Sequence, residues 1–507
     1  MCTSHEFERR NLIRLLSYAV GRTLGEIDTN DIFAAVENRP RVTGVAGDVI
    51  EQSLLGYPAD NAQRPDLDVD GVLMELKTTG IRKRRVGRRD VYVAKEPASI
   101  TAVSIGTIED EEFDDSAFWH KIAHMLFVFY EYESPNAVPP YEYRNFHVRG
   151  YNFFEFTGDD LDIIKNDWQI IHDFLADIRE RCSPEEARRE YPNLSTLINR
   201  QTVYLDTAPK YPHPPRFRIR KRVVDQIINE VFDGTRFRHI EHPLYELPEQ
   251  YIGYADLVER CHELTLQYRN KTVSQLAEEL GITTTLTDKN IAEKVIVAMF
   301  GGEERKLSKI GMFVRFGIKG KSITLSNSES RTEDTKLVAV NFEDLQELEV
   351  TDEETGELRA KRFEDSELYS FLNDHKFLFT VFQEPSTEAP LADNVFLGFK
   401  LLDLAYDELL EDAKACWEKA RWLLLNNELR LEPCKDRFGN QRYTPKTHLP
   451  MNAPNFPKAS EYDVFIRGTG NDAAHKKTIN GLEMYHQDYW VKGSILVERL
   501  NTIDIID

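Results

Sequence analysis

Cysteine is scarce in this chain of 507 residues, and its five cysteines are scattered without any C-x-x-C spacing. An odd number at irregular positions argues against a disulfide framework, and the missing C-x-x-C pairs argue against a thiolate zinc site. Long hydrophobic runs are also absent, because no apolar stretch approaches the roughly 20 residues that span a bilayer. The first residues, MCTSHEFERRNLIRLL, include acidic side chains and no apolar core typical of a signal peptide. We therefore expect a cytoplasmic protein that does not bind membranes.

Positive charge is in deficit as well, since 64 lysines and arginines stand against 86 aspartates and glutamates, for a formal net charge of -22. A field of this sign repels a polyanion at long range, but the Debye length of about 8 Å in physiological salt makes local patches more important than the sum. What the chain does have is 41% hydrophobic residues, which over this length suffices for two or three domains with their own cores.

The segment Arg64 to Thr79, RPDLDVDGVLMELKTT, has the pattern of a β-hairpin. Two alternating runs flank Asp70-Gly71, a dipeptide suited to a two-residue turn because both central positions need a positive φ. With that turn, Asp66 lies directly opposite Glu75. Side chains alternate along a strand, so Lys77 points to the same side as Glu75.

Two carboxylates side by side on one ribbon repel each other unless a cation lies between them, which is how a divalent metal site is built. We therefore predict that Asp66 and Glu75 bind a divalent metal ion, with Lys77 beside them. Asp68, which the register places opposite Leu73, stays an alternative for the first carboxylate. A solvated hairpin face is the simpler interpretation, because acid-x-Lys tripeptides recur in this chain. None of the others follows a Pro-Asp strand and an Asp-Gly turn.

Two further candidates lie on predicted helices. Glu51 lies among the apolar positions of GVAGDVIEQSLLG, which we interpret as a glycine-rich entry into a short helix before the hairpin. By itself, Glu51 is typical of a surface carboxylate near a helix N-terminus. Lys121 lies in DDSAFWHKIAHM, a predicted helix that leads into the buried strand LFVFYEY.

A basic cluster follows the hairpin directly, in the segment IRKRRVGRRD. Such a run is usually a solvated loop, but a phosphate backbone that approaches an acidic site needs positive charge nearby. We predict that this loop contacts nucleic-acid phosphates through Arg82, Lys83, Arg84, Arg85, Arg88 and Arg89.

The chain is predicted to consist of two related halves, joined by a proline-containing linker at Asp233 to Gln250. The first half contains DDSAFWHKIAHMLFVFYEY and the second contains EDSELYSFLNDHKFLFTVFQEP, and a long Trp-containing helix follows each segment. The second half lacks the hairpin motif, and Phe371 or Asn373 stands near the place of Lys121. If the halves are tandem copies of one fold, the first is catalytic and the second is not.

The segments GDVIEQSLLG, PDLDVDGVLMELKTT, AKEPASITAVS and WHKIAHMLFVF together resemble the MutH family of DNA mismatch-repair endonucleases and, more closely, the Sau3AI-type type II restriction endonucleases. In the second half, DSELYSFL, KFLFTVF and YHQDYWVKG follow in the order of that family. This resemblance implies an α/β (mixed α+β) fold with two tandem PD-(D/E)xK nuclease units, each a mixed sheet flanked by helices. It also implies a catalytic domain at residues 1–235 and a non-catalytic, DNA-binding and allosteric domain at residues 236–507.

The same resemblance implies a role for each candidate residue. The catalytic residues would be Glu51, Asp66, Glu75, Lys77 and Lys121. Of these, Asp66, Glu75 and Glu51 would be the ligands of Mg²⁺. The basic cluster after the hairpin would contact DNA. The expected substrate is double-stranded DNA containing GATC, and the expected functional partner is the cognate DNA methyltransferase of a restriction-modification system. The chain is expected to be a monomer in solution that acts in a dimer-like way on DNA. Relatives mostly have a shorter stretch between the aspartate and E-x-K, which keeps Asp68 open.

The expected function is therefore Mg²⁺-dependent, sequence-specific cleavage of both DNA strands by a type II restriction endonuclease. One alternative is a MutH-like nicking endonuclease directed by repair partners, although proteins of that type have a single domain. Another is a DNA-binding protein with a vestigial nuclease site, against which the intact set of Asp, Glu and Lys speaks.

Overall fold

The computed structural model describes most of the chain, and the predicted linker is the longest part that it leaves out. Described are residues 5–507 except 38–43, 59–63, 87–88, 104–106, 195–197, 199, 209–214, 233–250, 284, 286–287, 303–305, 308–309, 327–332, 353–356, 387–388, 407, 437, 445–447 and 470–475. The predicted boundary between residues 235 and 236 therefore lies outside the described residues.

A six-stranded mixed sheet organises the first half, and its strand β3 is by far the longest. The order is β1-β2-β3-β6-β7, and β4 pairs with the outer part of β3. β3 runs antiparallel to β2 and β4 and parallel to β6, while β6 and β7 are antiparallel. The bounds are β1 Glu6–Phe7, β2 Leu67–Val69, β3 Val72–Val86, β4 Arg89–Ala94, β6 Met125–Glu131 and β7 Val148–Phe154. A second sheet has the order β5-β9-β8, with β5 Ala98–Ala102, β8 Leu205–Ala208 and β9 Arg216–Ile219.

Helices flank these two sheets, and their apolar faces form the core. They are α1 Arg9–Ala19, α2 Leu24–Ile27, α3 Ile32–Val36, α4 Val45–Asp48, α5 Ala117–Ile122, α6 Asp159–Arg181, α7 Pro184–Asn193 and α8 Lys221–Phe232. The long helix α6 buries Trp168 among Phe113 and other core side chains, so this tryptophan is a packing residue. No helix of the described ranges is both long enough and apolar enough to cross a bilayer.

The described residues of the second half form two three-stranded sheets and three two-stranded sheets. One sheet has the order β10-β14-β15 and the other β11-β21-β18. The strands are β10 Ile318–Leu325, β11 Thr335–Ala339, β12 Glu349–Thr351, β13 Leu358–Ala360, β14 Lys376–Gln383, β15 Val395–Leu402, β16 Leu431–Pro433, β17 Asn452–Pro454, β18 Val464–Thr469, β19 Lys477–Ile479, β20 Leu482–Met484 and β21 His486–Val491. The helices are α9 Tyr254–Tyr268, α10 Val273–Glu279, α11 Ile291–Met299, α12 Gly311–Phe316, α13 Phe342–Gln346, α14 Glu367–Asp374, α15 Leu409–Leu425 and α16 Gly493–Asn501.

One arrangement recurs in both halves, at the two segments whose sequences look alike. In each, a strand pairs in parallel with the strand that follows a short helix, and the next strand returns antiparallel: β3, β6 and β7 in the first half, and β10, β14 and β15 in the second. The hydroxyls of Ser116 and Ser366 cap α5 and α14 by accepting a backbone N–H three residues on. The fold is thus mixed α/β, with mixed sheets flanked by helices in each half.

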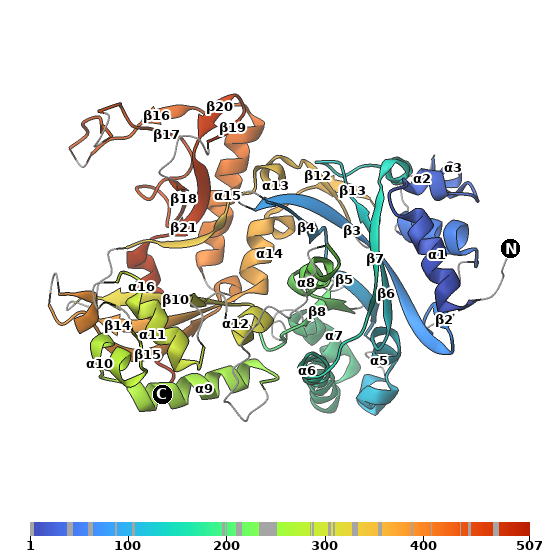
Figure 1. Cartoon of the computed structure of the whole chain (residues 1–507), viewed down its shortest axis with the longest axis horizontal. Helices are drawn as coiled ribbons and strands as arrows, with labels where there is room; N and C mark the ends of the chain where they lie inside the picture. The colour runs from blue at the N-terminus through green and yellow to red at the C-terminus, as the bar shows by residue number, and fades with distance from the viewer. Residues whose placement is uncertain are drawn as a thin grey trace.

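The two halves meet along a polar joint and a shared hydrophobic cluster. Side chains of the first half, such as Phe129 and Ile227, belong to the same buried cluster as Phe300 and Phe399 of the second. β3 extends from the first-half sheet toward α13 and the β12-β13 hairpin of the second half (Figure 1). The outer part of β3 is the segment predicted as a basic loop. That prediction was wrong, because Ile81–Val86 pairs antiparallel with β4.

Candidate active site

The predicted hairpin forms with the predicted turn. Asp70 and Gly71 both have positive φ, 52° and 86°, and Val69 pairs with Val72 across them. The carboxylate of Asp68 accepts a hydrogen bond from the backbone N–H of Gly71 at 2.7 Å. Asp68 is therefore engaged in the turn, whereas Asp66 lies just before β2 on the side of Glu75.

Asp66 is fixed against β3 by its own side chain. Its Oδ2 accepts a hydrogen bond from the backbone N–H of Leu76 at 2.8 Å. Burial raises the pKa of Asp66, and the nearby charge of Glu75 raises it further, while the Leu76 N–H and the two lysines oppose the shift. The structure thus brings the Asp66 and Glu75 carboxylates into the juxtaposition that the register predicts.

Glu75 is the buried centre of the cluster, with 2% of its surface exposed. Lys77 donates a hydrogen bond from Nζ to Glu75 Oε1 at 2.8 Å. Lys121, in the last turn of α5, donates to both carboxylate oxygens at 3.1 Å. Because α5 leads into β6, which pairs with β3 at Glu75, the helix delivers Lys121 to the same face as Lys77.

Glu51 faces this cluster from a π-helix, Val49–Leu55, that continues α4. Glycine at Gly44 starts α4 with φ of 80°, and the predicted apolar positions, such as Ile50, are buried. Burial raises the pKa of Glu51 to about 7, with the charges of Asp66 and Asp48 adding to the shift. π-Helical turns are rare and frequently occur at functional sites. Glu51 is therefore part of the cluster and not the surface carboxylate of the simpler interpretation.

The cluster holds three carboxylates, Glu51, Asp66 and Glu75, beside two ammonium groups, and carboxylate oxygens are the ligands that a hard cation prefers. Asp66 and Glu51 both hold protons more tightly than usual because neighbouring carboxylates share a poorly solvated space. Within the described residues, no group of three or more His, Cys, Asp or Glu side chains is arranged to hold a metal ion. The arrangement instead offers the paired carboxylates of Asp66 and Glu75, two ammonium groups, and Glu51 opposite.

Two contributors to this cluster were missed from the sequence. The His5 ring bonds through Nδ1 to the carbonyl oxygen of Asp66 at 2.7 Å and packs on the Tyr57 ring at a centroid distance of 4.5 Å. His5 reaches this place because β1 pairs in parallel with β2, a long-range contact with no local signal in the sequence. Asp48 precedes Glu51 by three residues, and that helical spacing could have identified it.

The described basic side chains of β3 are paired with carboxylates. Arg82 contacts Glu347 at 2.6 Å and Arg84 contacts Glu367 at 3.3 Å, both in the second half. Lys83 contacts Glu131 on β6 at 3.3 Å and is about half exposed. Arg88 and the side chains of Arg85 and Arg89 lie outside the described residues, so the DNA-contact prediction for this cluster stays a prediction.

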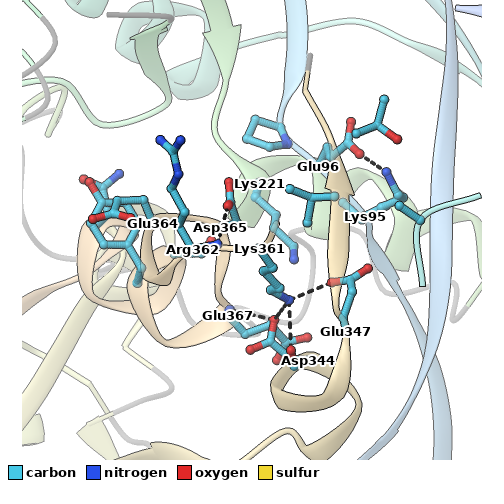
Figure 2. Close-up of a pocket in the computed structure, with 18 of the residues that line it drawn as sticks. Lys95, Glu96, Lys221, Asp344, Glu347, Lys361, Arg362, Glu364, Asp365 and Glu367 are labelled. Carbon is cyan, nitrogen blue, oxygen red and sulfur yellow. Dashed lines mark hydrogen bonds and ion pairs between the residues drawn. The ribbon is translucent and has the colours of Figure 1, made fainter. Parts of the chain in front are cut away.

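A cavity of about 620 Å³ lies between the halves, lined by Arg82, Lys95, Lys221, Glu347, Lys361 and others, and it contains none of the clustered carboxylates of the first half. Figure 2 shows Lys361 between Asp344 and Glu347, and its Nζ lies 2.6 Å from an oxygen of each. Glu347 also binds Arg82, so this ion-pair network joins β3 to the second half. The cavity is a charged joint between the halves, separate from the cluster around Glu75.

Comparisons with known proteins found a family and a relative that are similar to this chain. The family model of the DNA mismatch repair enzyme MutH matches residues 55–167, a range that includes Asp66, Glu75, Lys77 and Lys121. The type II restriction enzyme Sau3AI of Staphylococcus aureus is 23% identical over 419 residues, which cover 79% of this chain and 76% of that enzyme.

Proposed function

We propose that this chain, a Sau3AI-type protein of the MutH family, is a type II restriction endonuclease that hydrolyses both strands of DNA at a specific sequence in a Mg²⁺-dependent reaction. The observation that carries this proposal is the cluster on the first hairpin, where Asp66 and Glu75 lie together and two lysines contact Glu75. The cluster falls within the segment that matches the family, apart from Glu51, Asp48 and His5.

The side chains of this cluster supply the type of ligand that Mg²⁺ prefers. Mg²⁺ prefers carboxylate oxygens and keeps several waters, so two protein carboxylates and a phosphate oxygen are enough for it. Asp66 and Glu75 would hold the ion, with Glu51 as a third ligand or as a group that positions water. A bound Mg²⁺ would supply Lewis-acid stabilisation of the phosphate and a more acidic water. The raised pKa values of Asp66 and Glu51 support this assignment, because a cation would offset both the burial and the carboxylate repulsion that raise them.

The lysines and Glu51 would carry the remaining chemistry. Lys77 is placed to orient the attacking water and to stabilise charge on the phosphate, and Lys121 adds a second ammonium on the same face. Glu51, with a pKa of about 7, is partly ionised at neutral pH and can accept a proton from a nearby water. His5 holds the backbone of Asp66 and so would keep the first carboxylate in place.

We assign the parts of the reaction to the two halves as follows. Residues 1–235 would cut DNA, and residues 236–507 would bind DNA as an effector domain without cutting. The recognition sequence would be GATC, and a cognate DNA methyltransferase would protect host DNA. The similarity to the type II restriction enzyme Sau3AI covers 79% of this chain and so includes parts of both halves.

A plasmid assay tests the proposal. We would incubate the purified chain with Mg²⁺ or EDTA and with plasmids that carry or lack GATC, methylated or unmethylated, alongside Glu75→Ala and Asp66→Asn. Linear fragments that end at one motif support a restriction enzyme. Nicked circles would instead favour the MutH-like alternative, and bound but uncut DNA would favour a vestigial nuclease.

The effector role of the second half has a separate test. Plasmids with two recognition sites should be cut faster per site than plasmids with one, because the second site can occupy the second half. Equal rates per site would remove the effector role and leave the cleavage proposal intact.

A further inference from the structure

The second half carries a projecting arm, which we define as residues 430–455 without 437 and 445–447. The arm contains β16 and β17 and extends away from the body of the molecule (Figure 1). Its base is clamped by Asn455, which exchanges hydrogen bonds with the backbone of Arg430 and donates to the carbonyl of Glu428. Beyond β16 and β17 the chain forms two separate turns, which the isolated bridges Lys435–Gln441 and Tyr443–Pro450 close. The arm is therefore a two-stranded ribbon that ends in two turns.

The outer part of the arm exposes large apolar side chains that a soluble surface rarely groups together. Phe438 is 74% exposed, Leu449 61% and Tyr443 55%, and they rank among the most exposed large hydrophobic residues that the structure describes. The Phe438 turn is held in shape by Asp436, whose Oδ1 accepts the backbone N–H groups of Phe438 and Asn440 at 2.8 and 2.9 Å. Grouped exposed apolar side chains typically mark interaction sites.

The charge of the arm is opposite to that of the chain. Within the arm as defined, the basic residues are Arg430, Lys435 and Arg442 and the acidic residues are Glu432 and Asp436, in a protein with a net charge of -22. Glu432 is neutralised by Lys458 at 2.8 Å and Arg430 at 3.0 Å. Lys435 and Arg442 are exposed, and neither forms an ion pair with a residue of the described ranges.

We propose that this arm inserts into the major groove of duplex DNA, with Lys435 and Arg442 on backbone phosphates and Phe438, Tyr443 and Leu449 against base edges. A two-stranded ribbon fits the major groove, and apolar side chains there contact thymine methyl groups. Uncompensated lysine and arginine beside exposed aromatics suit a polyanion better than a protein partner, because the cores of protein interfaces are depleted of charge. The proposal rests on the proposed function and deepens it, since it names the element of the second half that contacts DNA.

Binding measured without cleavage tests the arm. The full chain is titrated, with Ca²⁺ replacing Mg²⁺, into short fluorescein-labelled duplexes that contain GATC or a scrambled sequence, and anisotropy is followed between about 50 and 200 mM salt. Lys435→Ala/Arg442→Ala should weaken binding to both duplexes about tenfold. It should also lower the slope of log affinity against log salt by about two, because two phosphate contacts are lost.

Phe438→Ala should act differently from the charge variant. It should lower the preference for GATC over the scrambled duplex about tenfold and leave the salt slope unchanged, because it removes a base contact and no charge. The matched controls are Lys289→Ala/Lys306→Ala for the charges and Leu266→Ala for the apolar residue, all exposed and outside the arm. Controls should bind as the wild type does, and thermal unfolding should show every variant folded.

The outcomes separate this proposal from the proposed function. If the wild type cuts at its site while both arm variants bind like the controls, the arm proposal is overturned and the nuclease stands. If the arm variants change the molecular mass by light scattering and leave DNA affinity alone, the arm is a surface between copies of this chain and the DNA proposal fails. If the wild type neither binds nor cuts any duplex, the proposed function itself is wrong.

Discussion

The two halves build the same three-strand unit and put different residues at its centre. In the first half, Glu75 on β3 pairs with Met125, the residue after His124. In the second half, the residue after His375 is Lys376, and its partner on β10 is Ile318. A buried carboxylate in one half thus corresponds to a buried aliphatic side chain in the other.

The two strands also differ at the next residue on the same face, two positions after Glu75 on β3 and after Ile318 on β10. Lys77 lies two residues after Glu75, and the corresponding residue of β10 is Gly320. A Cβ at Gly320 would lie 2.9 Å from the Phe313 ring and 3.0 Å from Leu307, so this face of β10 is closed by packing. The three-strand unit is therefore a scaffold common to both halves. The residues at a few of its positions decide whether the carboxylates and lysines of a candidate active site are present.

The largest expected effect on DNA cleavage comes from removing the carboxylate of Glu75, which has no counterpart on β10 of the second half. Glu75→Gln should lower the rate of DNA cleavage by at least about 10²–10³-fold, because losing one transition-state stabilising group costs this much. The matched variant is Asp403→Asn in the second half, which removes the carboxylate 2.8 Å from Lys376 and should change the rate only a few-fold. Single-turnover cleavage measures both. A comparable loss from the two variants would contradict the division between the halves.

The opposite substitution tests whether β10 can tolerate a buried carboxylate at the position that corresponds to Glu75. Ile318→Glu should lower the free energy of unfolding by about 3 kcal/mol and create no new cleavage, because it puts a carboxylate into a packed core. Val314→Glu, at an exposed position of α12, should cost far less. Urea denaturation gives the comparison. A small effect at Ile318 would show that this face of β10 admits charge.

The raised pKa of Glu51 predicts that the stability of the protein depends on pH. Because the folded-state pKa is about 7 against an ordinary 4.5, the folded chain binds more protons than the unfolded chain between these values. Stability conferred by this group is therefore present below pH 4.5 and is lost as pH rises toward 7. Without metal, Glu51→Gln should raise the free energy of unfolding at about pH 8 by about 2 kcal/mol and have little effect at about pH 4.

The control for this pH effect is Glu278→Gln, an exposed glutamate of α10. Urea denaturation at the two pH values should show no gain for it. Saturating Mg²⁺ should also shrink the advantage of Glu51→Gln, since the ion would offset the repulsion that raises the pKa. An equal gain at both pH values would rule out titration of Glu51 as the cause.

The smallest effect is expected at the joint between the halves. Although burial alone would raise it, Arg82 and Lys361 hold the pKa of Glu347 below its ordinary value. A double-mutant cycle with Arg82→Ala and Glu347→Gln should give a coupling of about 1 kcal/mol, because the Arg82 guanidinium is partly exposed to solvent. The same cycle on Lys83 and Glu131, within the first half, should give less. Coupling near zero at Arg82 would show that this contact does not hold the halves together.

Most of the hairpin could be predicted because its signals are local. Asp70-Gly71 fixes the turn, the turn fixes the register, and strand alternation then places Asp66, Glu75 and Lys77 on one side. These inferences need only the geometry of a strand and a turn. Lys121 was assigned to the site by the family resemblance alone.

What could not be predicted depends on contacts distant in sequence. The basic stretch after Gly80 has low strand propensity, and it extends β3 because β4 pairs with it and acidic residues such as Glu347 lie nearby. His5 is brought to Asp66 by the parallel pairing of β1 with β2. Because β1 has only two residues, its sequence cannot show the alternating pattern that identifies a strand. The π-helical turn at Glu51 likewise looks like an ordinary helix in the sequence.

β3 has 15 residues and no unpaired joint after Glu75: β6 accompanies it to Ile81 and β4 from there to Val86. A ribbon bonded in this way bends little, and about five residues at 3.3 Å each, or roughly 17 Å, separate Lys77 from Arg82. If the second half rotates and keeps its ion pairs with Arg82 and Arg84, strand β3 should move with it. Lys77 and Glu75, on the same strand, should then move as well. We therefore expect the position of the second half and the position of the Glu75 cluster to be coupled through β3.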